Sequence, residues 1–171
     1  MTHPATIDED DLLKQCAWTR TRGSGPGGQR RNKVETGASL LHEPTQVSAQ
    51  AGERRSQEEN KRVALKRLRL ALAVQHRTPV APPKGLDEIA SALWRSRRQG
   101  DKIVCNTRHR DFPSLLAEAL DVIADSGWKP PKAALRLGVT SSQMLKLLRE
   151  HPPAMVKLNE ERATRRLSAL S

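Results

Sequence analysis

The feature that most constrains this chain is a glycine-rich segment that ends in cations, Arg22-Gly23-Ser24-Gly25-Pro26-Gly27-Gly28-Gln29-Arg30-Arg31-Asn32-Lys33. Glycine takes positive φ values and lets the backbone approach another molecule closely, whereas proline fixes φ. Ordering such a segment costs conformational entropy, which favours a role in binding something that offsets this cost. The glutamine amide among arginines and a lysine indicates a phosphate-rich partner. From composition alone, an ordinary surface turn is an equally good interpretation.

The residues after this segment are typical of a small mixed unit. Segments 35–45 and 46–52 fit two short strands with a turn at Glu43-Pro44-Thr45. Apolar residues then recur at spacings of three and four, which predicts a long helix, and Ser56 with Glu59 fits a capping box at its start. Three cations share a second stripe of that helix: Arg62, Lys66 and Arg69. This stripe either contacts a polyanion or is an ordinary solvated face.

In their order and spacing, these segments resemble the catalytic domain of class I peptide-chain release factors. The resemblance covers roughly residues 7–75 and rests on four motifs: Ser24-Gly25-Pro26-Gly27-Gly28-Gln29, Asn32-Lys33, His42-Glu43-Pro44-Thr45, and Arg55-Ser56-Gln57 with Asn60. A bare Gly-Gly-Gln sequence is a weak signal, whereas the ordered series is a specific one. The resemblance implies an α+β fold with a short antiparallel or mixed sheet and one long helix.

The resemblance also implies an activity, hydrolysis of the ester that joins a nascent peptide to transfer RNA on the ribosome. The implied catalytic residues are Gly27, Gly28 and Gln29. In this family the backbone N–H of the glutamine stabilises the oxyanion, and its side-chain amide admits water while excluding larger nucleophiles. The implied contacts to RNA phosphates come from Arg22, Arg30, Arg31 and Lys33. No cofactor or metal is implied, and the ribosome supplies most of the acceleration through positioning.

The composition agrees with a nucleic-acid partner. The 171 residues include 30 Lys and Arg against 19 Asp and Glu, a net charge of +11, which favours binding to a polyanion. Aromatic residues are scarce, with three Trp, one Phe and no Tyr. This scarcity argues against recognition by base stacking and favours phosphate contacts, so we expect binding to weaken steeply with salt.

The cysteines and the N-terminus bear on compartment and on metal binding. Cys16 and Cys105 are isolated, which supports neither a disulfide framework nor a zinc site, even if Cys105 and His109 share a helix face. The N-terminus resembles neither a secretory signal nor a membrane span. Its acidic cluster, residues 8–11, argues against a transit peptide and suits the first turn of a short helix. We therefore expect a soluble, cytoplasmic monomer without membrane contact.

The rest of the chain is predicted to be mainly helical. A proline-rich connector over 78–85 separates a catalytic domain, 1–77, from a helical domain, 86–171. The second domain is predicted to begin with a helix over 86–99 and a short strand over 102–106. Further helices are expected from 112 to before 127, from about 130 to 137, over 140–150 and over 154–169.

Residues 133–148 resemble a helix-turn-helix, with Gly138 at the turn and Thr140 as the cap of the second helix. In the functional interpretation, residues of the second helix touch nucleic acid, namely Ser141, Ser142, Gln143 and Lys146. In the structural interpretation, the two helices form a compact hairpin that packs a small domain. The structural interpretation is favoured, because the second helix carries only Lys146 and Arg149 as cations.

About six residues precede the resemblance, which leaves no room for a codon-reading domain. The leading hypothesis is therefore codon-independent hydrolysis of peptidyl-tRNA on stalled ribosomes or split large subunits. The basic residues of the tail are interleaved with Leu along expected helices, which disfavours a disordered tail that occupies the messenger channel. The two alternatives are a non-catalytic ribosome- or RNA-binding protein with the same fold and a helix-turn-helix DNA-binding regulator.

Overall fold

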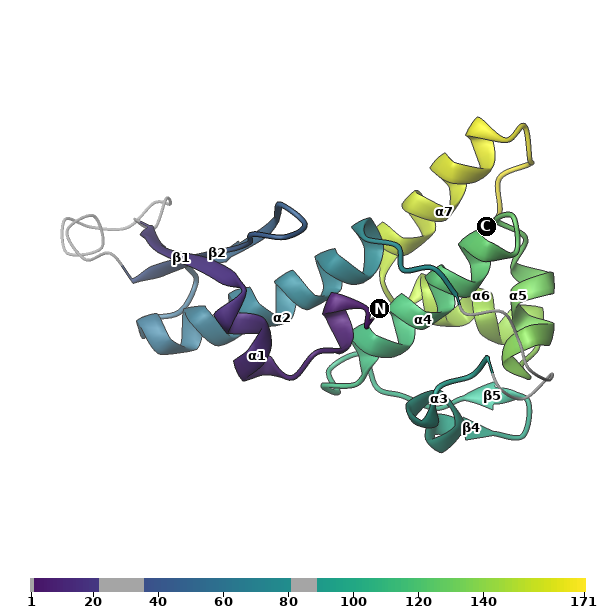
Figure 1. Ribbon diagram of the computed structural model, residues 1–171, viewed down its shortest axis with the longest axis horizontal. Helices are drawn as coiled ribbons and strands as arrows, with labels where there is room; N and C mark the ends of the chain where they lie inside the picture. Colours follow the sequence, from purple (N-terminus) through teal and green to yellow (C-terminus); the bar gives the residue numbers. More distant parts are fainter. Residues whose placement is uncertain (1, 22–35, 81–88) are drawn as a thin grey trace. The chain divides into compact units, whose positions relative to one another are not determined.

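The computed structural model describes residues 2–21, 36–80 and 89–171. The chain divides into two compact units, Ile7–Leu72 and Met1–Thr6 with Ala73–Ser171. The first unit combines a small antiparallel sheet with helices and the second is mainly helical, so the predicted α+β class is confirmed (Figure 1). Part of the predicted connector, residues 81–85, lies outside the described residues, and the predicted domain limits, 1–77 and 86–171, stay a prediction.

The unit Ile7–Leu72 is built around a three-stranded antiparallel sheet in the order β1-β2-β3. Its elements are α1 (Glu9–Lys14), β1 (Cys16–Thr21), β2 (Gly37–His42), β3 (Val47–Ala51) and α2 (Gln57–Gln75), the last of which continues past residue 72. The two strands predicted after residue 35 and the turn between them are confirmed. Sequence patterns alone do not indicate β1, because residues 18–20 of this edge strand are exposed and lack an apolar alternation.

Both helices of this unit begin at predicted signals. Asp8 caps α1 by accepting a hydrogen bond from the backbone N–H of Asp10 at 3.1 Å, and acidic residues fill the first turn. At the start of α2, Ser56 Oγ accepts from the backbone N–H of Glu59 at 3.4 Å. One stripe of α2 and the central strand β2 then supply buried apolar side chains to the core, namely Ala38, Leu40, Ala64, Leu65, Leu68 and Leu72.

The second unit, Met1–Thr6 with Ala73–Ser171, contains a short 3-10 helix (Pro4–Thr6), α3 (Ala92–Arg97) and a hairpin of β4 (Arg98–Gln99) and β5 (Lys102–Ile103). The later helices are α4 (Phe112–Asp125), α5 (Pro130–Leu137), α6 (Ser141–Arg149) and α7 (Pro152–Thr164). The first turns of α4, α5 and α7 each contain proline, where the missing N–H is not needed by the helix.

The structure corrects the predictions for the segment before α4. Among the described residues, the helix predicted over 86–99 is limited to Ala92–Arg97. Ser91 sets its start, because the Ser91 hydroxyl accepts from the backbone N–H of Trp94 at 3.0 Å. After Arg97 the chain enters the hairpin and turns at Gly100, which has a φ of 61°. The strand predicted over 102–106 ends at Ile103.

The last helix is also shorter than predicted. It runs over Pro152–Thr164 rather than 154–169. Arg166 takes a left-handed φ of 56°, which ends the helix and turns the tail back. The side-chain amide of Asn159 then accepts from the backbone N–H of Leu170 and donates to its carbonyl, both at 2.9 Å. These two bonds compete with continued helix, since they fix the tail beside α7.

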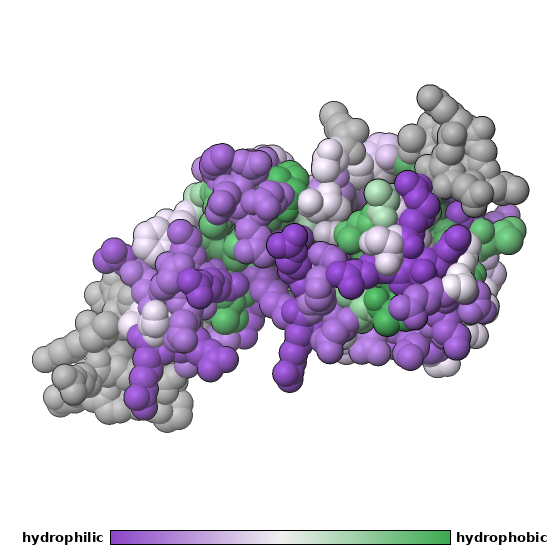
Figure 2. Space-filling model, turned by 90° about the horizontal axis from the view of Figure 1, so that it is seen from below, coloured by the Kyte–Doolittle hydropathy of each residue, from purple (hydrophilic) through white to green (hydrophobic). Residues whose placement is uncertain are grey.

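The core of this unit is centred on α4, which contributes the fully buried side chains Phe112, Leu115, Leu116, Leu120 and Ile123. Trp94 of α3 is also fully buried, and its indole N–H donates to the carbonyl of Leu137 at 3.0 Å. Figure 2 shows a largely hydrophilic surface with scattered apolar patches. Across the described ranges, the large apolar side chains that stay exposed are Trp18, Val104, Leu135 and Val156.

Two buried titratable groups in this unit have displaced pKa values. His3 is 6% exposed, and its Nδ1 accepts from the backbone N–H of Ala5 at 3.0 Å while its Nε2 donates to the carbonyl of His76 at 3.2 Å. Burial lowers the pKa of His3 from 6.5 to about 4. Asp121 lies 3.1 Å from Arg77, but burial is the larger effect and raises the pKa of Asp121 to about 6.

We expect His3 to make the second unit acid-sensitive between about pH 6.5 and pH 4. An unfolded histidine takes up a proton in this range and folded His3 does not, so the free energy of unfolding falls as the pH falls. At pH 5 the loss is on the order of 2 kcal/mol. Denaturant unfolding at pH 7 and pH 5 should show a larger loss for the wild type than for His3→Gln, in which Asp121 is unchanged. An NMR titration of His3 with a midpoint at the ordinary value, or equal losses in the two proteins, contradicts this prediction.

Candidate functional site

The predicted catalytic residues and four of the predicted RNA-binding cations lie outside the described residues: Gly27, Gly28, Gln29, Arg22, Arg30, Arg31 and Lys33. The structure does describe the residues on either side of them. Thr21, the last residue of β1, pairs with Gly37, the first residue of β2, in the antiparallel register. The chain therefore leaves the sheet and returns to it at two neighbouring positions.

The pairing of Thr21 with Gly37 requires glycine at position 37. A Cβ atom built on Gly37 would lie 2.6 Å from the carbonyl oxygen of Thr21 and would also collide with its hydroxyl. The carbonyl belongs to the backbone of the paired strand and cannot rotate away. Gly37 thus allows the two strand ends to approach more closely than any other residue would.

Asn60, in the first turns of α2, fixes the returning end of the chain. Its side chain is fully buried. The amide nitrogen donates to the carbonyl of Thr36 at 2.7 Å and to the carbonyl of Arg54 at 2.9 Å, and the amide oxygen accepts from the N–H of Arg54 at 2.9 Å. One side chain therefore satisfies three backbone groups outside the β-ladder. It joins the residue before β2, the segment after β3 and the start of α2.

His42 has a structural role at the end of β2. It is 1% exposed at the end of β2. Its Nδ1 lies 2.7 Å from Thr45 Oγ1 and its Nε2 lies 3.1 Å from Gln15 Oε1. The backbone N–H of Glu43 also donates to the carbonyl of Gln15 at 3.0 Å. The histidine thus braces the turn between β2 and β3 against the segment that leads into β1.

The three cations predicted to share a stripe of α2 have different environments. Arg62 and Lys66 are exposed, and Arg62 lies 3.6 Å from Glu58 with both side chains largely in solvent. Arg69 is only 8% exposed and lies 3.4 Å from Glu9 of α1. Arg69 follows the buried Leu68, so its side chain lies beside the core. The acidic cluster before β1 supplies its partner, which helical spacing alone does not reveal.

The turn predicted within residues 133–148 is present, and residues of the β4–β5 hairpin contact it. Gly138 has a left-handed φ of 67°, and Thr140 Oγ1 accepts from the backbone N–H of Gln143 at 3.2 Å, so the glycine turn and the threonine cap predicted between the two helices are both present. The N–H of Thr140 donates to the carbonyl of Asp101 at 3.2 Å. The Arg98 guanidinium fills the place that a Cβ on Gly138 would take. The β4–β5 hairpin therefore occupies the approach to this turn.

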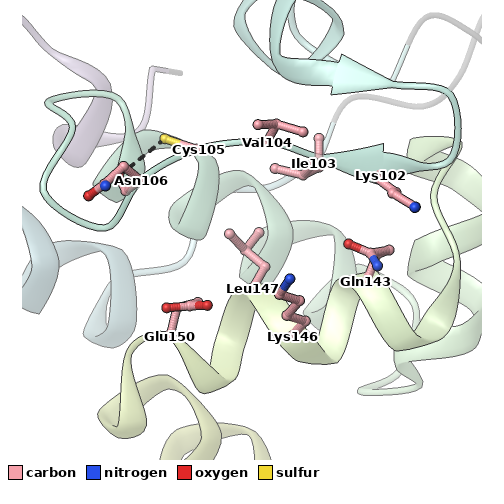
Figure 3. Close-up of a pocket in the computed structure, with 9 residues that line it drawn as sticks. All are labelled: Lys102, Ile103, Val104, Cys105, Asn106, Gln143, Lys146, Leu147 and Glu150. Carbon is pink, nitrogen blue, oxygen red and sulfur yellow. Dashed lines mark hydrogen bonds between the residues drawn. The ribbon is translucent and has the colours of Figure 1, made fainter.

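Two of the four predicted contact residues of α6, Gln143 and Lys146, line a cavity next to the same hairpin. Figure 3 shows Gln143 and Lys146 directed toward the strand that carries Lys102. Together with Cys105 and Glu150 they line a cavity of about 380 Å³. Ser141 is half-buried and Ser142 is exposed. Because the hairpin contacts the turn and lies across the cavity from Gln143 and Lys146, the arrangement favours the compact hairpin over a helix that enters a nucleic-acid groove.

No metal centre is found in the described part of the chain, where no three His, Cys, Asp or Glu residues are grouped to hold an ion. Cys105 and His109 do not share a helix, because both precede α4 in irregular structure. Among the helices of the described ranges, none has the length and apolar character needed to cross a membrane.

One family model and several known proteins match the sequence of this chain. The model of the RF-1 domain family matches residues 4–102, more than half of the chain. The chain belongs to the RF-1 domain family, the family of the catalytic domain of class I peptide-chain release factors. The resemblance stated from the sequence is thereby confirmed.

Individual relatives match only part of their own length. An uncharacterised, mitochondrial peptide chain release factor-like protein of Saccharomyces cerevisiae is 35% identical over 77 residues, which are 45% of this chain and 50% of that protein. A chloroplastic peptide chain release factor of Arabidopsis thaliana is 50% identical over 54 residues, 32% of this chain and 12% of that protein. Peptide chain release factor 2 of Sulfurovum is 45% identical over 75 residues, which are 42% of this chain and 21% of that protein. The chain thus spans half or less of the relatives it matches.

We expect Asn60→Ala to destabilise the unit Ile7–Leu72 by about 2–4 kcal/mol, because three buried backbone groups lose their partner. Asn60→Asp keeps the acceptor and loses both donors, so its loss should be substantial as well. Gln50→Ala removes an exposed amide from β3 of the same unit and is the control. Urea unfolding of the three variants measures the effect, and an Asn60→Ala loss no larger than that of Gln50→Ala contradicts the assigned role.

Proposed function

We propose that this protein hydrolyses the ester of peptidyl-tRNA on stalled ribosomes or split large subunits without reading a codon. The observation that carries the proposal is membership of the RF-1 domain family by a chain that has Gly27-Gly28-Gln29 in the family's motif order. The pairing of Thr21 with Gly37 supports it, because both ends of the segment that carries these residues are fixed to one end of the sheet.

The proposed reaction is acyl transfer to water. Attack on the ester carbonyl creates a tetrahedral oxyanion, and one well-placed donor is worth on the order of 2.7–4 kcal/mol to such a transition state. We assign this donor to the backbone N–H of Gln29, with the side-chain amide of Gln29 selecting water over larger nucleophiles. The glycines at 27 and 28 allow the backbone to approach the reacting ester closely.

This assignment does not require a nucleophilic triad. His42, which lies close in sequence, is already held by Thr45 and Gln15. The remaining acceleration comes from orientation of the ester and the water by the ribosome, which can supply a large part of a barrier reduction. The isolated protein should therefore have little activity toward a free ester.

The relatives of this chain differ in length. The 77 residues that match the yeast protein are half of its length, so that protein is comparable in length to this chain. The matches to chloroplastic and bacterial release factors cover about a fifth or less of those proteins. The β4–β5 hairpin argues against the DNA-binding alternative, because it covers the turn between α5 and α6.

Peptide release by the purified full chain tests the proposed reaction. We expect release from ribosomes stalled on messenger ends and from split large subunits carrying peptidyl-tRNA, with a similar rate whether or not a stop codon is present. Gln29→Ala and Gly28→Ala should lower the rate by about 100-fold or more. Gln75→Ala, an exposed amide on α2, is the matched control and should retain activity.

Two results would overturn the proposal. Undiminished release by Gln29→Ala removes the assigned catalytic residue. Tight binding to ribosomes without release in any stalled context favours the alternative, a non-catalytic ribosome- or RNA-binding protein with the release-factor fold.

The exposed cations of α2 should contribute to affinity rather than to chemistry. We expect Arg62→Gln with Lys66→Gln to weaken binding to large subunits and to reduce the slope of log affinity against log salt by about 2. Lys14→Gln, a paired cation on α1, is the control. Arg69→Gln should instead lower the free energy of unfolding, since Arg69 is buried beside Glu9. An unchanged salt slope in the double variant contradicts the prediction.

A further inference from the structure

The exposed tryptophan in the unit Ile7–Leu72 is unusual for this protein. Trp94 and Trp128 are 0% and 4% exposed, whereas Trp18 on β1 is 39% exposed. Buried tryptophans in this chain serve the core, as the bond of Trp94 to Leu137 illustrates. An indole left in solvent forgoes part of the stabilisation that burial would give it, which directs attention to its surroundings.

Trp18 and Arg20 lie on the face of the sheet that packs on α2. In the register of β1 with β2, Trp18 pairs with Leu40 and Arg20 pairs with Ala38, and both partners are fully buried. Residues paired across an antiparallel ladder point to the same face. Because β1 is an edge strand, these two side chains stand at the open edge of the sheet and the helix.

Two cations lie over the indole ring at cation–π distance. The guanidinium carbon of Arg20 lies 5.7 Å from the ring centroid, and the ammonium of Lys61, which comes from α2, lies 5.6 Å from it. Among the described residues, neither cation has a carboxylate within ion-pair distance. The surface thus combines an aromatic face with two positive charges, and we call these three residues the Trp18 patch.

The Trp18 patch complements a nucleotide. An indole offers a face on which a base can stack, and stacking of this kind tolerates any base. The cations of Arg20 and Lys61 lie over the ring in the unbound protein, and a stacking base has to displace at least one of them from the ring face. Both side chains are long, and Arg20 is exposed while Lys61 is half-buried, so a displaced cation can swing to the phosphates next to the base. A duplex keeps its bases stacked on each other, so the patch suits an unpaired nucleotide rather than a helix of RNA.

The position of the patch agrees with this partner. Trp18 is three residues before Thr21, a distance of about 10 Å along the strand. Lys61 directly follows Asn60, whose amide bonds the carbonyl of Thr36. The patch therefore lies near the end of the sheet where the described chain departs at Thr21 and returns at Thr36.

We propose that Trp18, Arg20 and Lys61 bind an unpaired nucleotide of RNA, with the base stacked on the indole and the phosphates held by the two cations. The proposal goes beyond peptide release, because it requires RNA binding and not ester hydrolysis. It also refines the expectation from composition. Scarce aromatic residues exclude a broad stacking platform, but a single exposed tryptophan between cations is sufficient for one base.

The intrinsic fluorescence of the full chain tests the proposal directly. Trp18 is the accessible indole, while Trp94 and Trp128 are buried. We expect a single-stranded RNA 12-mer to quench the emission of Trp18, and a duplex RNA or inorganic polyphosphate to quench it much less. Trp18→Phe should remove this quenching and retain most of the affinity, because phenylalanine keeps an aromatic face.

Matched variants separate stacking from charge and from stability. Trp18→Leu keeps an apolar side chain without an aromatic face, and we expect about tenfold weaker binding of single-stranded RNA with little change for polyphosphate. Arg20→Gln with Lys61→Gln should weaken both ligands and reduce the salt dependence. Gln29→Ala should bind the single-stranded RNA as the wild type does.

Equal quenching by polyphosphate and single-stranded RNA, or equal affinity of wild type and Trp18→Leu for the RNA, overturns the proposal. In that case the cations only brace the edge of the sheet. Failure of Trp18→Leu to fold does not hide the answer, since the quenching of the wild type and the affinity of Trp18→Phe decide it. Loss of patch binding leaves the result with Gln29→Ala untouched, so the two proposals fail separately.

Discussion

The amide of Asn60 is the interaction on which the sheet-containing unit depends. Its three hydrogen bonds use both donors and the acceptor of one side chain. They join α2 to the chain before β2 and to the chain after β3, where no strand partner is available. The close approach of Gly37 to Thr21 completes the arrangement on the opposite strand. A buried amide and a missing Cβ thus fix the described residues Thr21, Thr36 and Gly37.

The net charge of +11 overstates how many cations a polyanion can reach on the surface. Several cations serve the fold instead: Arg69 lies beside Glu9, Arg77 beside Asp121, and Arg162 donates to the carbonyls of Trp128 and Ser168 at 2.7 and 2.8 Å. Cations that are buried and paired cannot release counterions when RNA binds. The electrostatic contribution therefore comes from exposed residues such as Arg62, Lys66 and those of the Trp18 patch.

Periodicity and capping were enough to predict β2, β3, α2 and most of the later helices, because these elements bury one regular face. They were insufficient for β1, whose exposed edge position removes the pattern, and for the ends of α3 and α7, which depend on Ser91 and on the Asn159 contacts with the tail. The resemblance singled out His42 and Asn60 as motif residues, but it did not predict the hydrogen-bond partners of either side chain. The Trp18 patch joins β1 to α2 across 43 residues of sequence, and no local pattern connects them. The predicted catalytic residues lie outside the described residues, so their placement stays a prediction.

The packing of the N-terminus has a consequence for the order of folding during synthesis. The strand pairs of the sheet connect residues 16–51, so they can form soon after this stretch emerges. The backbone carbonyl of Ala5 accepts a hydrogen bond from the hydroxyl of Ser114, which lies 109 residues later in the sequence. At ordinary translation rates this separation corresponds to on the order of ten seconds. Residues 4–6 are therefore made well before they can pack, and a nascent chain must carry them unpacked until α4 has left the exit tunnel.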